Sequence, residues 1–138
     1  MPRQTGEAIA VRSTQKRAGR GQDMACILII DDEERIRALL RELFEDAGYD
    51  VVEAPDGVAG LCAYRAQGAD VVIMDMIMPQ WSGLETIRKL REAFPQAKII
   101  AISGRVDLLA LAQTSGAIRT LQKPFAPAAV LHAVREVL

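Results

Sequence analysis

Residues 25–48 read ACILIIDDEERIRALLRELFEDAG, and the periodicity of this stretch changes in its middle. The first six residues are continuously apolar, which is typical of a parallel strand covered on both faces. After four acidic residues, apolar side chains recur at helical spacing through Ala47, and Gly48 is a typical helix stop. The stretch therefore predicts a buried strand followed at once by an amphipathic helix.

The same alternation continues along the chain. Further strands are predicted at residues 51–54, 71–74, 98–102 and 118–122. Each precedes a helical pattern; Gly60 weakens the second helix, and Leu108, Leu111, Ala112 and Ser115 mark the buried face of the fourth. Five strand-helix repeats joined by short loops predict an α/β fold, a doubly wound five-stranded parallel sheet with helices on both faces.

Composition excludes several classes of protein. Half of the 138 residues are hydrophobic and a quarter are charged, as in one globular domain. The net charge of -1 disfavours nucleic acid as a partner, and the apolar runs are too short to cross a membrane. Cys26 and Cys62 lie in apolar stretches without metal-ligand spacing, so we expect two reduced core thiols in a cytoplasmic protein.

The first 23 residues differ from the rest of the chain. They carry five basic residues against two acidic ones and lack a sustained apolar pattern. This composition predicts a disordered basic N-terminal extension at 1–23, followed by one domain at 24–138. Because the sequence ends with the fifth helix, we expect a stand-alone module.

Polar residues follow four of the predicted strands: Asp31 and Asp32 the first, Asp75 the third, Ser103 the fourth and Lys123 the fifth. The carboxyl ends of parallel strands meet at one edge of the sheet, where ligands bind in such folds. The set combines hard oxygen ligands for Mg²⁺, a nucleophilic carboxylate and two groups that bind phosphoryl oxygens. The first turn is acidic instead of glycine-rich, which disfavours a dinucleotide site.

Several motifs occur in an order that resembles the receiver domain of two-component response regulators, over residues 24–138. These are Asp31-Asp32, Asp75-Met76-Ile77-Met78-Pro79 with Gly83, Ser103, Gly116-Ala117 and Lys123-Pro124-Phe125. The resemblance implies a flavodoxin-like sheet with strand order 2-1-3-4-5.

The resemblance also implies a role for each site residue. Asp75 would accept a phosphoryl group from a sensor histidine kinase or a phosphotransfer protein, and Ser103 and Lys123 would hold phosphoryl oxygens. Mg²⁺ would be ligated by Asp32, Asp75 and the backbone carbonyl of Ile77, with Asp31 acting mainly through a water. The Lys123-Pro124 bond would be cis. Such a protein is not an enzyme beyond its own phosphorylation and dephosphorylation.

The sequence departs from this family where many receivers have an aromatic residue three positions before the lysine. Thr120 stands there, so we expect the signal to travel through the strand-four loop and helix four. That helix holds more apolar residues than one buried stripe requires. It is either deeply buried or carries an exposed patch for a protein partner or a homodimer.

Two other functions remain open: a Mg²⁺-dependent phosphatase that forms an aspartyl-phosphate, and a binding-only pseudo-receiver. For a receiver, we expect output through a downstream protein partner, without direct contact to nucleic acid or a membrane.

By the same resemblance, Ile77 and Arg105 flank the approach of water to an aspartyl-phosphate. Ile77 is apolar, and the cationic Arg105 is expected to cover or pair with the phosphoryl oxygens. Both features predict slow self-dephosphorylation.

Overall fold

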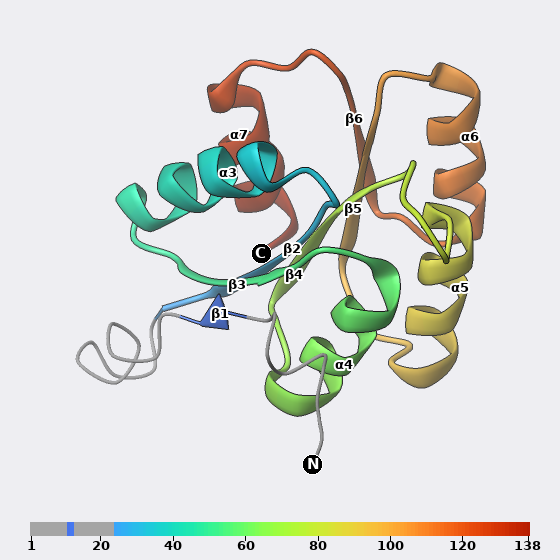
Figure 1. The fold of residues 1–138 in the computed structure, drawn as a ribbon. Helices are drawn as coiled ribbons and strands as arrows, with labels where there is room; N and C mark the ends of the chain where they lie inside the picture. Colours follow the sequence, from blue (N-terminus) through green and yellow to red (C-terminus); the bar gives the residue numbers. More distant parts are fainter. Residues whose placement is uncertain (1–10, 13–23) are drawn as a thin grey trace.

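A computed structural model describes residues 11–12 and 24–138 of the chain. The described residues form a central sheet with helices packed on both of its faces (Figure 1). The predicted extension at 1–23 lies outside the described residues except for Val11–Arg12. None of the helices in the described part of the chain is long and apolar enough to span a membrane.

The observed elements follow the predicted alternation. The strands are β1 (Val11–Arg12), β2 (Cys26–Ile30), β3 (Asp50–Ala54), β4 (Val71–Asp75), β5 (Ile99–Ser103) and β6 (Arg119–Gln122). The helices are α3 (Glu34–Asp46), α4 (Gly57–Gln67), α5 (Gly83–Ala93), α6 (Val106–Ser115) and α7 (Pro127–Val137). Asp75 and Ser103, expected to follow their strands, are instead the last residues of β4 and β5.

The strand order confirms the predicted topology. Five parallel strands run in the order β3-β2-β4-β5-β6, which is 2-1-3-4-5 when these strands are counted along the chain. A sixth strand, β1, pairs antiparallel with β3, with Val11 opposite Glu53 and Arg12 opposite Val52. The sequence does not predict this strand, because two residues are too few to show a periodic pattern.

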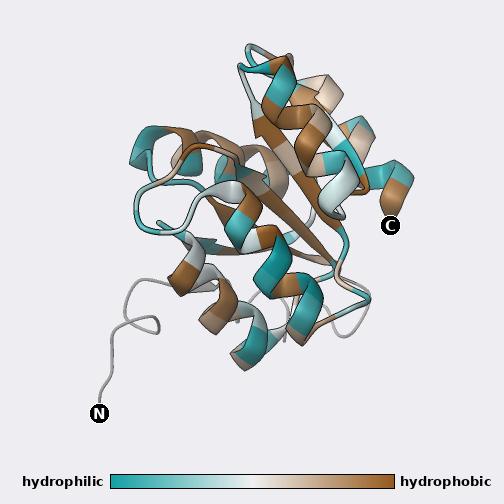
Figure 2. Ribbon diagram, turned by 90° about the vertical axis from the view of Figure 1, so that its right-hand side faces the viewer, coloured by the Kyte–Doolittle hydropathy of each residue, from teal (hydrophilic) through white to brown (hydrophobic). Residues whose placement is uncertain are grey.

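The sheet separates two hydrophobic layers. Helices α3 and α7 cover one face, and helices α4, α5 and α6 cover the other (Figure 1). Alternate residues of each central strand enter opposite layers, as Ile27 and Leu28 of β2 do. Figure 2 shows this composition, with mostly hydrophobic strands between helices that contain both hydrophobic and hydrophilic residues. Burial on both faces explains why the strand sequences are continuously apolar.

Helix α6 differs from its predicted orientation. Its buried residues are Leu109 and Ala112, whereas Leu111 and Ser115, assigned to the buried face, are exposed. Val106 is 62% exposed and Leu111 48% exposed. Of the two alternatives for this helix, the structure therefore favours the exposed apolar patch.

The two cysteines also differ from each other. Cys26 is buried in β2, as predicted, but Cys62 is exposed on α4. The prediction of a core thiol was wrong for Cys62 because the apolar pattern around it does not define one face. Small residues cover much of α4, and its buried side includes Ala59, Gly60 and Ala63.

Gly60 allows α4 to lie close against β2. A Cβ atom at this position would lie 2.3 Å from Ile30 Cδ1 and 2.8 Å from Ile30 Cγ1. Ile30 is fully buried, so it has little room to move away. Close packing thus explains a glycine that intrinsic helix propensity disfavours.

We expect Gly60→Ala to lower the free energy of unfolding by about 1 kcal/mol, because overpacking outweighs the gain in helix propensity. Urea unfolding followed by circular dichroism measures the effect. In an Ile30→Val background, which lacks the nearest atom, the same substitution should cost less. A more stable Gly60→Ala variant in the wild-type background would contradict this account.

Candidate functional site

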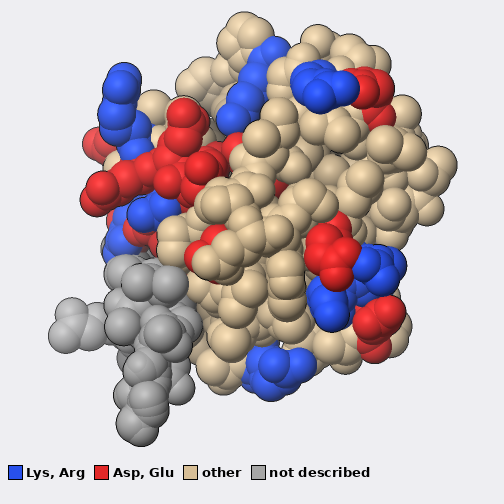
Figure 3. Space-filling view, turned by 45° about the vertical axis from the view of Figure 1, so that its right-hand side comes forward, with Lys and Arg blue, Asp and Glu red and all other residues tan. Residues whose placement is uncertain are grey.

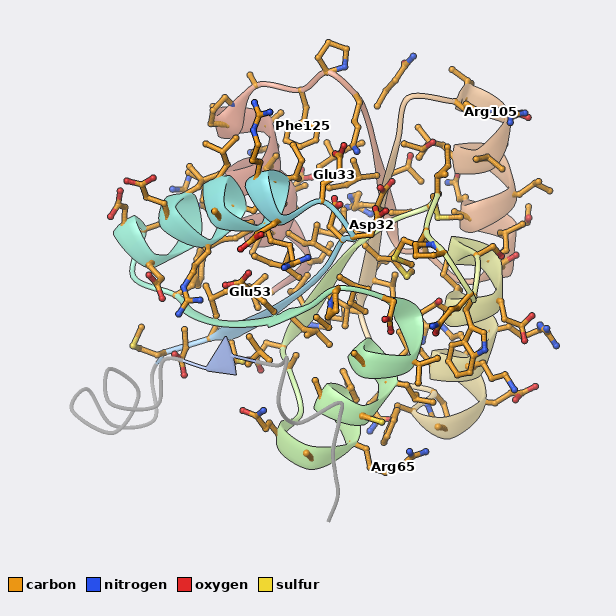
Figure 4. All side chains as sticks on the ribbon, in the orientation of Figure 1. Asp32, Glu33, Glu53, Arg65, Arg105 and Phe125 are labelled. Atoms are coloured by element: carbon orange, nitrogen blue, oxygen red, sulfur yellow. The ribbon has the colours of Figure 1, made fainter. Side chains whose placement is uncertain are left out.

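Three carboxylates meet at the carboxyl edge of the sheet. Asp31 and Asp32 follow β2, and Asp75 ends β4, the neighbouring strand. One oxygen of each carboxylate lies within 4.8 Å of the other two. Asp31 and Asp75 are buried, whereas Asp32 is exposed, at the end of β2 beside Glu33 (Figure 4). A compact set of hard oxygen donors open on one side suits a Mg²⁺ ion that keeps several waters.

Hydrogen bonds fix Asp31 on three sides. Its N–H donates to the Ala54 carbonyl of β3 at 3.1 Å, and Oδ1 accepts from the Glu33 N–H at 2.9 Å. Its carbonyl oxygen accepts from Arg37 Nη1 at 2.7 Å. The turn between β2 and α3 is thereby held, which directs the carboxylate toward Asp75.

The carboxylates are held at an electrostatic cost. Burial, with the nearby charges of Asp75 and Asp32, raises the pKa of Asp31 to about 6, although the Glu33 N–H and Lys123 oppose the shift. Burial likewise raises the pKa of Asp75, and Lys123 is the strongest opposing influence. The folded metal-free protein therefore resists full ionisation of this cluster.

Lys123 and Ser103 complete the cluster. Lys123 Nζ lies 3.6 Å from Asp75 Oδ2, and the Lys123-Pro124 bond is cis, as expected. Ser103 is buried, and its Oγ accepts a hydrogen bond from the Arg105 N–H at 3.1 Å. One pocket is lined by Asp32, Glu33, Asp75, Ile77, Ser103, Gly104 and Lys123. The structure thus brings together the site residues that the sequence singled out.

The loop after β4 shapes the rim of this pocket. The Ile77 N–H donates to Asp75 Oδ1 at 3.4 Å, while the Ile77 side chain is 57% exposed. Gly83 closes the loop, because its N–H donates to the Met76 carbonyl and a Cβ there would lie 2.5 Å from Met76 Cα. Ser82 then caps α5 by accepting from the Glu85 N–H. The position of Ile77 therefore follows from a tightly packed turn.

Arg105 lies differently from the sequence expectation. Its guanidinium donates to both carboxylate oxygens of Asp107, at 3.2 and 2.6 Å. Figure 4 places the Arg105 side chain at the outer side of α6, away from Asp32 and Glu33. Among the described residues, the contact of Arg105 with the site is made by its backbone N–H, which donates to Ser103 Oγ.

Sequence reasoning missed Arg37. This residue contacts the backbone of Asp31 and pairs with Glu53 of β3. The available signal was its position in the sequence, because the first turns of the helix that follows the acidic residues must lie near them. Its acceptors were hidden, because one is a backbone carbonyl and the other lies on a different strand.

A parallel sheet in this order, with acids, a hydroxyl and a lysine at its carboxyl edge, defines a CheY-like class of α/β protein. The family model for the response regulator receiver domain matches residues 27–135. The chain therefore belongs to the response regulator receiver domain family.

Individual relatives agree with this assignment. The chain is 34% identical over 114 residues to the chemotaxis protein CheY of Thermotoga maritima, covering 80% of this chain and 95% of the relative. It resembles the crystal structure of Vibrio cholerae CheY4, with a TM-score of 0.79 and 30% identity over 83% of this chain and 99% of that one. It also resembles the TrrA protein of Thermotoga maritima, solved in complex with Mg²⁺-BeF, with a TM-score of 0.78 and 32% identity over 83% and 100% of the two chains.

Coverage differs among relatives. The chain spans nearly all of the Thermotoga maritima CheY but 48% of the transcriptional regulatory protein PhoP of Bacillus subtilis, to which it is 34% identical. The similarity thus concerns a module that occurs both alone and within longer proteins.

Replacing Asp31 by Asn should stabilise the metal-free protein at pH 7 by about 2 kcal/mol, because the folded state then no longer holds a buried carboxylate. The pKa of Asp31 is raised from 3.8 to about 6. The wild type therefore loses stability as the pH rises between these values, and the advantage of Asp31→Asn should disappear near pH 3.5.

Urea unfolding in EDTA at several pH values measures this difference. Glu92→Gln, which neutralises an exposed carboxylate on α5, is the control and should show no comparable gain. A less stable Asp31→Asn variant at pH 7 would mean that the carboxylate, with its hydrogen bond from Glu33, stabilises the fold.

Proposed function

We propose that this receiver domain, at residues 24–138, accepts a phosphoryl group on Asp75. The observation that carries the proposal is the placement of the Asp75 carboxylate. It is buried, 3.6 Å from the Lys123 ammonium and within 4.8 Å of the carboxylate oxygens of Asp31 and Asp32. A nucleophile thus lies beside a fixed cation and a set of metal-ligating oxygens.

Asp31, Asp32, Asp75 and the backbone carbonyl of Ile77 would hold Mg²⁺. Hard oxygen donors from carboxylates and a carbonyl match the preference of this ion. When bound, Mg²⁺ would neutralise the negative charge that otherwise keeps a phosphoryl oxygen away from these acids. The similar TrrA protein was solved with Mg²⁺-BeF, which supports the same choice of metal here.

The chain's own residues would then have distinct roles. An Asp75 oxygen forms a bond to phosphorus while the bond from phosphorus to the donor's histidine nitrogen breaks, and that nitrogen keeps the electron pair. Lys123 and the Ser103 hydroxyl bind oxygens of the transferred group. The Ser103 hydroxyl also accepts a hydrogen bond from the Arg105 N–H, next to the start of α6, so a shift of the hydroxyl toward a phosphoryl oxygen would alter this bond. Phosphorylation of Asp75 would therefore change the contacts of the segment that leads into α6.

The donor would be a sensor histidine kinase or a phosphotransfer protein, and the protein would act in the cytoplasm. Output would pass to a downstream protein partner, without direct contact to nucleic acid or a membrane. Exposed Val106 and Leu111 on α6 support a protein contact there, with a partner or a second copy. Thr120, half-buried on β6 opposite Ala101, stands where many receivers carry an aromatic residue. We therefore keep the prediction that signalling uses α6 and its preceding loop.

Asp75→Asn should abolish phosphorylation while leaving the fold intact, because an amide oxygen is a poor nucleophile. The protein is incubated with acetyl phosphate and Mg²⁺, and intact mass is followed for a gain of about 80 Da, the mass of one phosphoryl group. Asp56→Asn, which keeps its capping role at the start of α4, is the matched control and should be labelled like wild type.

The same experiment separates the three functions. One stable adduct on wild type supports a receiver, multiple turnover indicates a phosphatase, and no adduct indicates a pseudo-receiver. Labelling of Asp75→Asn to the wild-type extent would move the nucleophile to another residue.

Ile77→Asn should speed loss of the phosphoryl group roughly tenfold, if a polar side chain lowers the barrier to water attack by about 1.4 kcal/mol. Ile77 lines the pocket and cannot orient a water. Decay is timed by intact mass after acetyl phosphate is removed. Arg105→Ala should change the lifetime less than twofold, because Arg105 pairs with Asp107. Equal lifetimes for Ile77→Asn and wild type would exclude Ile77 as the barrier.

A further inference from the structure

Arg37 joins three segments of the protein that meet behind the acidic cluster. It lies on α3 and is largely buried, with 16% of its side chain exposed. Its Nη1 donates to the Asp31 carbonyl at 2.7 Å, and its Nε donates to Glu53 Oε1 at 3.2 Å. The rigid, planar guanidinium group thus connects the turn after β2 to the adjacent strand β3 through two hydrogen bonds.

Glu53 is itself fixed from a second side. Its other carboxylate oxygen accepts from Arg41 Nη1, one helical turn after Arg37, and Arg41 also pairs with Glu45 at 3.3 Å. Only 13% of the Glu53 side chain is exposed. Figure 4 places Glu53 on β3 below α3, and Figure 3 shows the acidic side chains of one side of the molecule with Lys and Arg directly beside them. Arg37 is therefore held by a partly buried ion-pair network.

The bond to Asp31 acts on a residue with little freedom left. The Asp31 N–H is held by Ala54 and its carboxylate by the Glu33 N–H. The Arg37 bond fixes the remaining polar group, the carbonyl, and with it the peptide plane that leads into Asp32. The orientation of both acids toward Asp75 thus depends on that peptide.

We propose that Arg37 is a positioning residue for the acidic cluster: by holding the Asp31 carbonyl, it keeps Asp31 and Asp32 in the arrangement that binds Mg²⁺. The inference rests on the proposed function, since it assigns Mg²⁺ to these carboxylates. Arg37 does not contact the metal or the phosphoryl group. It acts through the backbone, and Glu53 holds it in place.

The chain contains a matched control for this role. Arg41 lies on the same helix, pairs with the same Glu53 carboxylate and carries the same charge, but among the described residues no hydrogen bond joins Arg41 to Asp31. Both Arg37→Gln and Arg41→Gln therefore remove a cation and an ion pair with Glu53, and Arg41→Gln also removes the pair with Glu45. Only Arg37→Gln removes the hydrogen bond to Asp31.

The experiment measures Mg²⁺ binding to the folded full chain, from the Mg²⁺-dependent shifts of amide signals in ¹H-¹⁵N NMR spectra. Outer contacts of metal ligands typically change metal affinity by 10- to 100-fold, so we expect Arg37→Gln to weaken Mg²⁺ binding about tenfold. Arg41→Gln should change it less than twofold. Urea unfolding of each variant without metal gives the stability separately.

Equal Mg²⁺ affinities for Arg37→Gln and wild type would overturn the proposal, even if Arg37→Gln were less stable, because a merely structural role lowers stability alone. Equal weakening by both variants would also overturn it and would assign the effect to charge. If Arg37→Gln does not fold, Arg37→Lys and Arg41→Lys replace the pair. Lysine keeps the charge but lacks the planar fork, so only Arg37→Lys should weaken Mg²⁺ binding.

The phosphorylation assay separates this proposal from the proposed function. A wild type that binds Mg²⁺ and is labelled at Asp75, with no selective effect at Arg37, refutes the positioning role alone. A wild type that binds no Mg²⁺ refutes both. In the expected case, Arg37→Gln is labelled by acetyl phosphate but needs a higher Mg²⁺ concentration for the half-maximal rate.

Discussion

The mutual repulsion of Asp31, Asp32 and Asp75 is the constraint on which the rest of this structure depends. Three carboxylates within 4.8 Å of one another would separate if they were free to move. They stay together because two adjacent strands end at the same level and because packed turns fix the following residues. The packing of the apolar layers on both faces of the sheet thus provides the stability that offsets the repulsion among these carboxylates.

Much of the fold was predictable because its signals are local or follow from simple topology. The change of period in residues 25–48 defined the first strand-helix unit, and its repetition defined the parallel sheet. The positions of Asp75, Ser103 and Lys123 at strand ends followed from the same pattern. Their proximity required only that parallel strands share one carboxyl edge.

What the sequence did not predict depends on partners distant in the chain. The pairing of β1 with β3 involves two residues without periodicity, and the Arg37 contacts involve a backbone carbonyl and another strand. The exposed side of α6 was misassigned because the hydrophobic residues among Val106–Ser115 lie on more than one face of the helix, so periodicity does not select the buried face. Arg105 was expected at the pocket, but the nearby Asp107 competes for its guanidinium.

The unequal exposure of the two cysteines gives the chain a built-in chemical reporter. The sequence holds two thiols, of which Cys26 lies inside the sheet and Cys62 on the surface of α4. An alkylating reagent should therefore mark one thiol in the native state and a second only when β2 is released. Mass spectrometry after brief labelling then counts molecules that have opened their central sheet, and a dye on Cys62 can report from α4, which provides none of the proposed site residues.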